Sequence, residues 1–292
     1  MKRTVVIGYD HSRSSDRALD QAGREAAWRG ATVTVVNAFH WVAATTPVAY
    51  IPMNVETSLE TAAKEVAATG VDLLRRRYPD LTVESRVIAG PTADAIAEAA
   101  RDAEVLVLGN RGRGGFAGLL LGSVSMRTLT LASCPTMIVR GTERDPADLV
   151  VLAVDIEEPA DEVVDFAFAE AAARAAGLRV VSACDVDWAE VDNAPGPGDD
   201  LAQARTHIAT ELHAKLADRL RPWQTAHPDV PLTIDLVDGA PSAVLTKATE
   251  TADLIVVGGR RRGDTRPGMR LGPVANTLVH HADCPVVVVP RG

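Results

Sequence analysis

Short continuous runs of Val, Ile and Leu alternate with Ala-rich segments along the first half of the chain. The runs predict buried strands, because parallel strands covered on both faces are apolar throughout rather than alternating. They lie at Thr4–Tyr9, Thr32–Ala38, Thr82–Ile88, Val105–Leu108 and Thr136–Arg140. The Ala-rich segments predict helices at Ser14–Arg29, Val55–Arg77, Thr92–Arg101 and Val124–Leu131. Such alternation is typical of a doubly wound α/β domain, whose ligands bind beyond the carboxyl ends of the strands.

The second half of the chain repeats the first, with four segments recurring at offsets between 145 and 150 residues. The pairs are Val6–Asp10 with Val151–Asp155, Gly90–Pro91 with Ala240–Pro241, Val105–Gly109 with Leu254–Gly258, and Ala132–Val139 with Ala282–Val289. Offsets this consistent indicate a tandem duplication, joined by the polar stretch Gly141–Pro146. We therefore predict two doubly wound domains, residues 1–144 and 145–292. Each is expected to hold a five-stranded, mostly parallel sheet with helices on both faces.

A helical face is visible in the second half as well. Val164, Phe168, Ala171 and Ala175 recur every three or four residues. This spacing places them on one side of a helix, and we predict that all four turn toward the core.

The composition is that of an ordinary globular protein, since 47% of the 292 residues are apolar and 24% are charged. No apolar run approaches the roughly 18–20 residues of a membrane helix, and the basic start Met1–Gly8 is too short for a signal peptide. Cys134, Cys184 and Cys284 are far apart, so neither a disulfide framework nor a metal site is expected. We expect a cytoplasmic protein with no membrane partner, in which Cys134 and Cys284 are small buried residues.

Charge is unevenly distributed along the chain, which carries −9 overall. The first 145 residues hold 17 basic and 16 acidic side chains, and the rest hold 13 and 23. An acidic chain is not expected to bind nucleic acid, which requires a basic face. The acidic half nevertheless contains five close arginines, Arg260, Arg261, Arg262, Arg266 and Arg270. This loop is either solvated or an anion site, because so many like charges repel one another.

The loop after the fourth strand carries the candidate chemistry of the first half. Its glycines, which let backbone amides turn toward a ligand, are Gly109, Gly112, Gly114, Gly115 and Gly122. The last of them opens a helix, and free amides at a helix N-terminus bind phosphate. The other candidate contacts are Arg111, Arg113, Ser123, Val124 and Ser125. The loop matches neither a Walker A motif nor GxGxxG after the first strand. We predict a nucleotide phosphate site.

These residues resemble a known family. Gly109, Gly112, Gly122 and Ser123 match the pattern G-x2-G-x9-G-S/T of the ATP-binding branch of the universal stress protein family. The opening Val6–Asp10 and the Cys134–Pro135 pair before the last strand are similar to that family too. The resemblance covers nearly the whole chain, in the tandem-domain form. It implies an adenine nucleotide alpha hydrolase-like fold, ATP as the bound ligand and a regulatory role in stress survival.

The resemblance also implies roles for residues outside the loop. Asp10 would receive the ribose or adenine end of ATP, and Gly8 and Ala38 would line that pocket. Asp10 as a simple turn former or helix charge remains the alternative. Universal stress proteins pair through the edges of their sheets, so the resemblance implies that the final strands of the two halves pair and that two chains form a homodimer.

The second half departs from the glycine pattern. Its substitutions are Ala153 for Gly8, Arg261 for Gly112 and Pro273 for Ser123. The proline removes an amide and a hydroxyl donor together. Asp155, Gly258 and Gly272 are retained, although the two glycines lie one residue further apart than their counterparts. Because the arginine-rich loop could still hold phosphates, we leave open whether these three residues form a second, weaker nucleotide site.

Catalysis has little support in the sequence. The seven histidines form no HExxH or HxxxH pattern paired with a carboxylate motif. Phosphoryl transfer needs a positioned nucleophile and usually a metal held by carboxylates, and near the loop there is only Asp10. We favour a protein that is not an enzyme, in which bound ATP, alone or with Mg²⁺, biases conformation, dimerisation or the choice of a regulatory protein partner. A slow ATPase or a nucleotidyl-transferring enzyme of the same architecture is the alternative.

Overall fold

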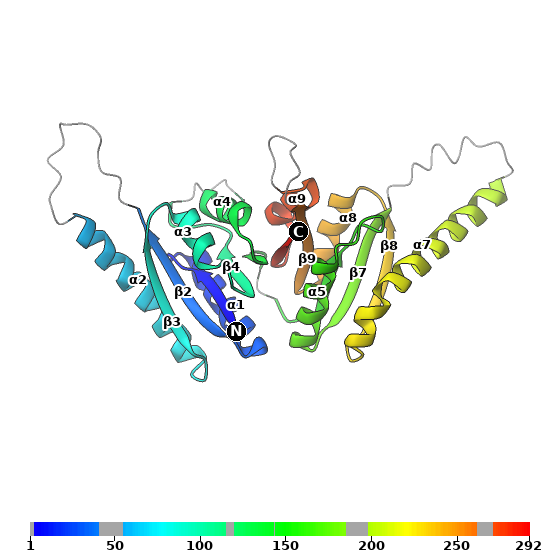
Figure 1. Ribbon diagram of the computed structural model, residues 1–292. Helices are drawn as coiled ribbons and strands as arrows, with labels where there is room; N and C mark the ends of the chain where they lie inside the picture. The colour runs from blue at the N-terminus through cyan, green and yellow to red at the C-terminus, as the bar shows by residue number, and fades with distance from the viewer. Residues whose placement is uncertain (1–2, 41–54, 115–119, 143, 185–197, 262–270) are drawn as a thin grey trace, which may run out of the picture. The chain divides into compact units, whose positions relative to one another are not determined.

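The computed structural model describes residues 3–40, 55–114, 120–142, 144–184, 198–261 and 271–292 (Figure 1). The chain divides into two compact units, Met1–Arg140 and Gly141–Gly292. Each unit is an α/β domain of the kind that the alternating pattern predicts.

The first unit has five strands and four helices among its described residues. The strands are β1 (Thr4–Gly8), β2 (Thr32–Phe39), β3 (Val83–Ala89), β4 (Val105–Gly109) and β5 (Thr136–Val139). The helices are α1 (Arg13–Arg29), α2 (Val55–Arg77), α3 (Thr92–Ala99) and α4 (Ser123–Leu131). Every boundary lies within two residues of the one that the sequence predicts.

The strands of the first unit pair in the order β3-β2-β1-β4-β5, and all neighbours are parallel. The chain moves outward from β1 to β3 and then returns to β4, so the order reverses between β1 and β4. Because parallel crossovers are right-handed, α1 and α2 cover one face and α3 and α4 the other. Helix α1 accordingly contacts α2, and α3 contacts α4 (Figure 1). The doubly wound arrangement is confirmed.

The second unit repeats this plan. Its strands are β6 (Leu149–Ala153), β7 (Gly177–Cys184), β8 (Leu232–Asp238), β9 (Leu254–Arg261) and β10 (Val286–Arg291). Its helices are α5 (Asp161–Arg174), α7 (Gly198–Ala226), α8 (Pro241–Ala248) and α9 (Pro273–His281), with a 3-10 turn at Thr249–Thr251. The parallel sheet runs β10-β9-β6-β7-β8, so the order reverses between β6 and β9.

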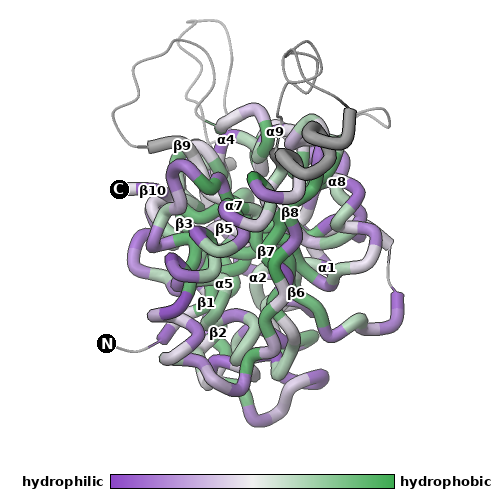
Figure 2. Tube along the Cα trace, turned by 90° about the vertical axis from the view of Figure 1, so that its right-hand side faces the viewer, coloured by the Kyte–Doolittle hydropathy of each residue, from purple (hydrophilic) through white to green (hydrophobic). Residues whose placement is uncertain are grey.

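Each core is built from the strands that read as continuous apolar runs. Val5–Ile7 in β1 and Val105–Val107 in β4 are almost completely buried, as are Val150–Leu152 in β6. Hydrophobic residues concentrate along the strands, as β6 and β7 show in Figure 2. Two covered faces therefore explain why these strands carry no polar alternation.

One predicted core position is wrong. Val164, Phe168 and Ala171 are buried in α5, but Ala175 is exposed. Helix α5 ends at Arg174, and Ala175 adopts φ 52° and ψ 37° as its left-handed C-cap. The helical spacing could not reveal this, because the fourth position falls just beyond the last turn.

Among the described residues, no helix combines the length and the apolar composition needed to cross a membrane.

Candidate functional site

The candidate site of the first half lies where the strand order reverses, at the carboxyl ends of β1 and β4. This is the position at which doubly wound sheets bind ligands. The described part of the glycine-rich loop leaves β4 at Gly109 and rejoins the fold at Gly122. The Gly122 amide donates to the Asn110 carbonyl over 2.7 Å, which ties the two ends of the loop together.

The first turn of α1 holds the start of the loop in place. Ser14 Oγ donates to Asn110 Oδ1 over 2.7 Å and accepts from the Arg111 amide at 3.2 Å. A Cβ on Gly109 would lie 2.6 Å from Ser14 Oγ and 2.8 Å from the Ser14 backbone. Gly109 is therefore required by the close approach of α1 to β4, before any ligand is considered.

Asp10 anchors the next part of the loop. Its carboxylate accepts from the Ser12 amide at 3.1 Å and from the Arg113 amide at 3.0 Å. A Cβ on Gly112 would lie 2.7 Å from Asp10 Oδ2, so a side chain there would have to displace the Asp10 carboxylate from this position. Burial alone would raise the pKa of Asp10, but hydrogen bonds with Ser12, Ser15 and the Arg113 amide bring the pKa below its usual value.

Asp10 does form a turn, as the alternative interpretation predicts, because its carboxylate accepts a hydrogen bond from the amide of Ser12, two residues further on. Contact with the ribose or adenine end of ATP stays a prediction.

Helix α4 begins at the far side of the loop without a side-chain cap. Its N-cap is Gly122, with φ −72° and ψ 149°, and no side chain of the described residues caps it. By contrast, α1 begins with a capping box formed by Ser12 and Ser15. A Cβ on Gly122 would lie 3.5 Å or more from its neighbours, so the fold has room for a capping side chain there. The open amides of α4 are available to an anion.

The two serines of α4 differ in their environment. Ser123 is exposed at the start of the helix, and Ser125 is buried. Ser125 Oγ donates over 2.8 Å to the Gly109 carbonyl. The hydroxyl of Ser125 therefore joins α4 to β4, and the backbone amides and Ser123 are the donors left for a ligand.

The remaining predicted contacts of the first half surround this loop. Gly8 ends β1, where a Cβ would lie 2.8 Å from Leu108 Cδ2, and Ala38 is the penultimate residue of β2. Arg111, Arg113 and Gly114 are exposed in the loop, and Val124 is exposed on α4. Gly115 lies outside the described residues.

At the equivalent place in the second half lies a pocket of about 880 Å³. It opens at the carboxyl ends of β6, β7 and β9 and reaches the N-termini of α8 and α9. Asp155, Gly258 and Gly272, the three residues retained from the predicted site, all line it. Strand β9 continues to Arg261, so the stretch after Gly258 extends a strand where the first half has already entered its loop. The side chains of the arginine-rich loop lie outside the described residues.

The pocket depends on a missing helical turn. At the offset of 145, Glu157 and Ala160 replace the two capping serines of α1, and Pro159 replaces Ser14. Helix α5 consequently begins at Asp161, three residues later than its counterpart. Without that turn, nothing like Ser14 packs on Gly258. A Cβ there would instead lie 3.2 Å from the stem of Arg291 and from Val163.

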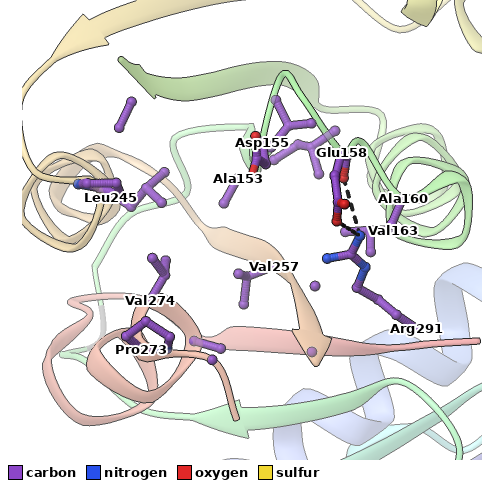
Figure 3. Close-up of a pocket in the computed structure, with 18 of the residues that line it drawn as sticks. Ala153, Asp155, Glu158, Ala160, Val163, Leu245, Val257, Pro273, Val274 and Arg291 are labelled. Atoms are coloured by element: carbon purple, nitrogen blue, oxygen red, sulfur yellow. Dashed lines mark hydrogen bonds and ion pairs between the residues drawn. The ribbon is translucent and has the colours of Figure 1, made fainter. Parts of the chain in front are cut away.

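Sequence reasoning missed Glu158 and Arg291, which line this pocket. Arg291 Nη2 lies 3.6 Å from Glu158 Oε2 and donates to the Glu158 carbonyl at 3.3 Å (Figure 3). One signal in the sequence could have revealed the pocket. The capping serines Ser12 and Ser15 have no counterparts in the second half, which indicates that its first helix starts later.

Comparison with known proteins agrees with this geometry. A model of the universal stress protein family matches residues 1–140 and, a second time, residues 147–290. The chain belongs to the universal stress protein family.

Full-length relatives share its tandem form. The universal stress protein Rv2005c of Mycobacterium tuberculosis (strain ATCC 25618 / H37Rv) is 33% identical over 291 residues, covering 97% of this chain and 96% of that protein. The crystal structure of a universal stress protein from Archaeoglobus fulgidus DSM 4304 covers 99% of this chain and 98% of its own, with a TM-score of 0.68 and 20% identity. That likeness shows the fold alone. A solved universal stress protein in complex with cAMP matches 47% of this chain at 30% identity, with a TM-score of 0.36 and 97% of its own length covered.

The described thiols of this universal stress protein are buried. Burial raises the pKa of Cys134 to about 11 and that of Cys284 to about 12. The prediction that both are small buried residues is confirmed. Within the described part of the chain, no group of three or more His, Cys, Asp or Glu side chains could hold a metal ion.

Proposed function

We propose that the first half of this universal stress protein binds ATP, and that the bound nucleotide regulates its conformation and its choice of partner during stress. In this proposal the protein acts in the cytoplasm as a homodimer. ATP would lie at the carboxyl ends of β1 and β4, its phosphates against the loop after β4 and its nucleoside toward Gly8 and Ala38.

The observation that carries the proposal is the contrast between the starts of α1 and α4, the two helices that border the loop after β4; α3 also lacks a side-chain cap but does not follow this loop. Helix α1 is capped by its own serines, whereas α4 presents uncapped amides at the end of a loop fixed by Ser14 and Asp10. A preset row of backbone donors needs little reorganisation to receive phosphate oxygens, which favours binding. Arg111 and Arg113, exposed in the same loop, add positive charge.

We further propose that the protein is a nucleotide-dependent switch and not an enzyme. The carboxylate nearest the loop, Asp10, already accepts two backbone amides. Its lowered pKa also makes it a weak base. A slow ATPase would need another group to orient the attacking water.

Three measurements test this proposal. Mass spectrometry of the gently purified protein should identify a bound adenine nucleotide, and calorimetry of the nucleotide-free chain should give micromolar or tighter ATP binding. Incubation with ATP should release no ADP above the buffer control. Absence of ATP binding would sink the proposal, and steady ADP release would establish the enzymatic alternative.

A further inference from the structure

The pocket of the second half has the size of a small-molecule site. Its volume of about 880 Å³ lies within the range of roughly 300–1,000 Å³ that is usual for small-ligand pockets. Its accessible lining is divided almost evenly between polar and apolar atoms, and the apolar part includes the side chains of Ala153, Val163, Leu245, Val257 and Val274. Figure 3 shows Pro273 and Val274 of α9 on one side of this space and Val163 of α5 on another. A ligand body of low polarity would be desolvated favourably against the apolar part of this lining.

The described charges of this pocket do not favour an anion. Its lining contains two carboxylates, Asp155 and Glu158, and one guanidinium, Arg291. The guanidinium already contacts Glu158 through its carboxylate and its carbonyl. Asp155 is the counterpart of Asp10, and its side chain is exposed. Its Oδ1 accepts a hydrogen bond from the Glu157 amide at 3.0 Å, whereas in Asp10 both carboxylate oxygens accept from backbone amides. Asp155 is thus placed to accept a hydrogen bond from a ligand.

The helix start that faces the pocket has also lost phosphate donors. Pro273 is the first residue of α9, where it supplies neither an amide hydrogen nor a hydroxyl. Helix α8, whose N-terminus also lines the pocket, begins with Pro241, as its counterpart in the first half begins after Pro91.

From these observations we infer that the second half binds a small, phosphate-free ligand of nucleoside size, with Asp155 accepting a hydrogen bond from it. The duplication has then produced two sites of different chemistry, one for a nucleotide and one for an uncharged or cationic amphipathic molecule. The inference rests on the proposed function only in the choice of adenosine as the probe.

The experiment uses the full chain carrying Gly122→Asp, which places a carboxylate at the phosphate site of the first half. Adenosine and ATP are titrated separately, and alkylation of Cys284 and Cys134 reports which half is protected. We expect adenosine to bind at least tenfold more tightly than ATP and to slow the labelling of Cys284. A further Asp155→Asn substitution at this exposed position should weaken adenosine at least fivefold, whereas Asp10→Asn should leave the protection of Cys284 unchanged.

Three results would overturn the inference. In the first, the Gly122→Asp chain binds ATP more tightly than adenosine, and ATP protects Cys284. This result would mean that the arginine-rich loop holds phosphates. The second is no binding of adenosine, and the third is adenosine binding that Asp155→Asn does not change. Failure of the proposed function would appear separately, as loss of ATP binding to the unsubstituted chain.

Discussion

The glycines of the loop after β4 serve different purposes. Gly109 is required by the protein itself, because a Cβ there would collide with the Ser14 backbone, whereas a Cβ on Gly112 would only displace the Asp10 carboxylate. Gly122 has no such neighbour and no positive φ. A side chain at Gly122 would therefore not strain the backbone, and a loss of ATP binding on substitution there would report on the ligand and not on the fold.

Ser123 and Ser125 should separate binding from stability. Ser123→Ala removes an exposed hydroxyl at the start of α4, and a hydrogen bond to a charged group is worth roughly 1.5–3 kcal/mol, or about 10- to 100-fold in affinity. Ser125→Ala leaves the Gly109 carbonyl without its donor, which should cost about 1–3 kcal/mol of folding stability. Calorimetry with ATP and denaturant unfolding of both variants check this, and the reverse assignment of the two effects would contradict it.

The helix ends at Gly30 and Ala175 make a matched pair. Both adopt the left-handed conformation, with φ 61° and 52°, but only one is glycine. The Cβ of an L-residue costs about 1 kcal/mol there. Ala175→Gly should therefore stabilise the second half by somewhat less than that, and Gly30→Ala should destabilise the first by a similar amount. Thermal unfolding measures both, and an Ala175→Gly variant less stable than the parent would disprove the argument.

At the scale of the element, α1 holds the start of the loop after β4 in place. Ser14 bonds to Asn110 and Arg111 without lying among the proposed phosphate donors. At about 1 kcal/mol for each lost hydrogen bond, Ser14→Ala should lower ATP affinity roughly 5- to 20-fold. Thr61→Ala, which deletes an exposed hydroxyl bonded within α2, is the control and should have no effect on binding. Equal affinities of the two variants for ATP would show that the loop needs no support from α1.

Most elements were predictable because two covered sheet faces impose long apolar runs, as in Val105–Leu108. The glycine-rich loop between β4 and α4 was also predictable, since its glycine spacing is a local property; its role in binding phosphate stays a prediction. The pocket of the second half was not. It depends on whether α5 starts at Glu158 or at Asp161, since the capping serines of α1 have no counterpart in the repeat. The stem of Arg291 also packs on Gly258, where Ser14 packs on Gly109 in the first half. The partners of Asp10 were likewise hidden, because Arg113 is 103 residues away.

At the scale of the whole molecule, each unit carries one described buried thiol. Cys134 belongs to the first and Cys284 to the second, and both have raised pKa values, so neither should react at neutral pH until its unit opens. A ligand that binds only the folded state suppresses opening. Saturating ATP should therefore slow alkylation of Cys134 at least tenfold more than that of Cys284, as mass spectrometry of timed samples would measure. Equal protection of the two thiols would contradict separate sites.

The central claim is that the first half provides the phosphate site and the second does not. The most direct test is one ATP titration of three full-length chains: the parent, Gly122→Asp and Gly272→Asp. Both substitutions place a carboxylate at the N-cap of the equivalent helix, and neither added Cβ meets a close neighbour. Repulsion between like charges costs on the order of several kcal/mol. We predict a loss of more than a hundredfold for Gly122→Asp and less than threefold for Gly272→Asp, whereas equal losses would contradict the account.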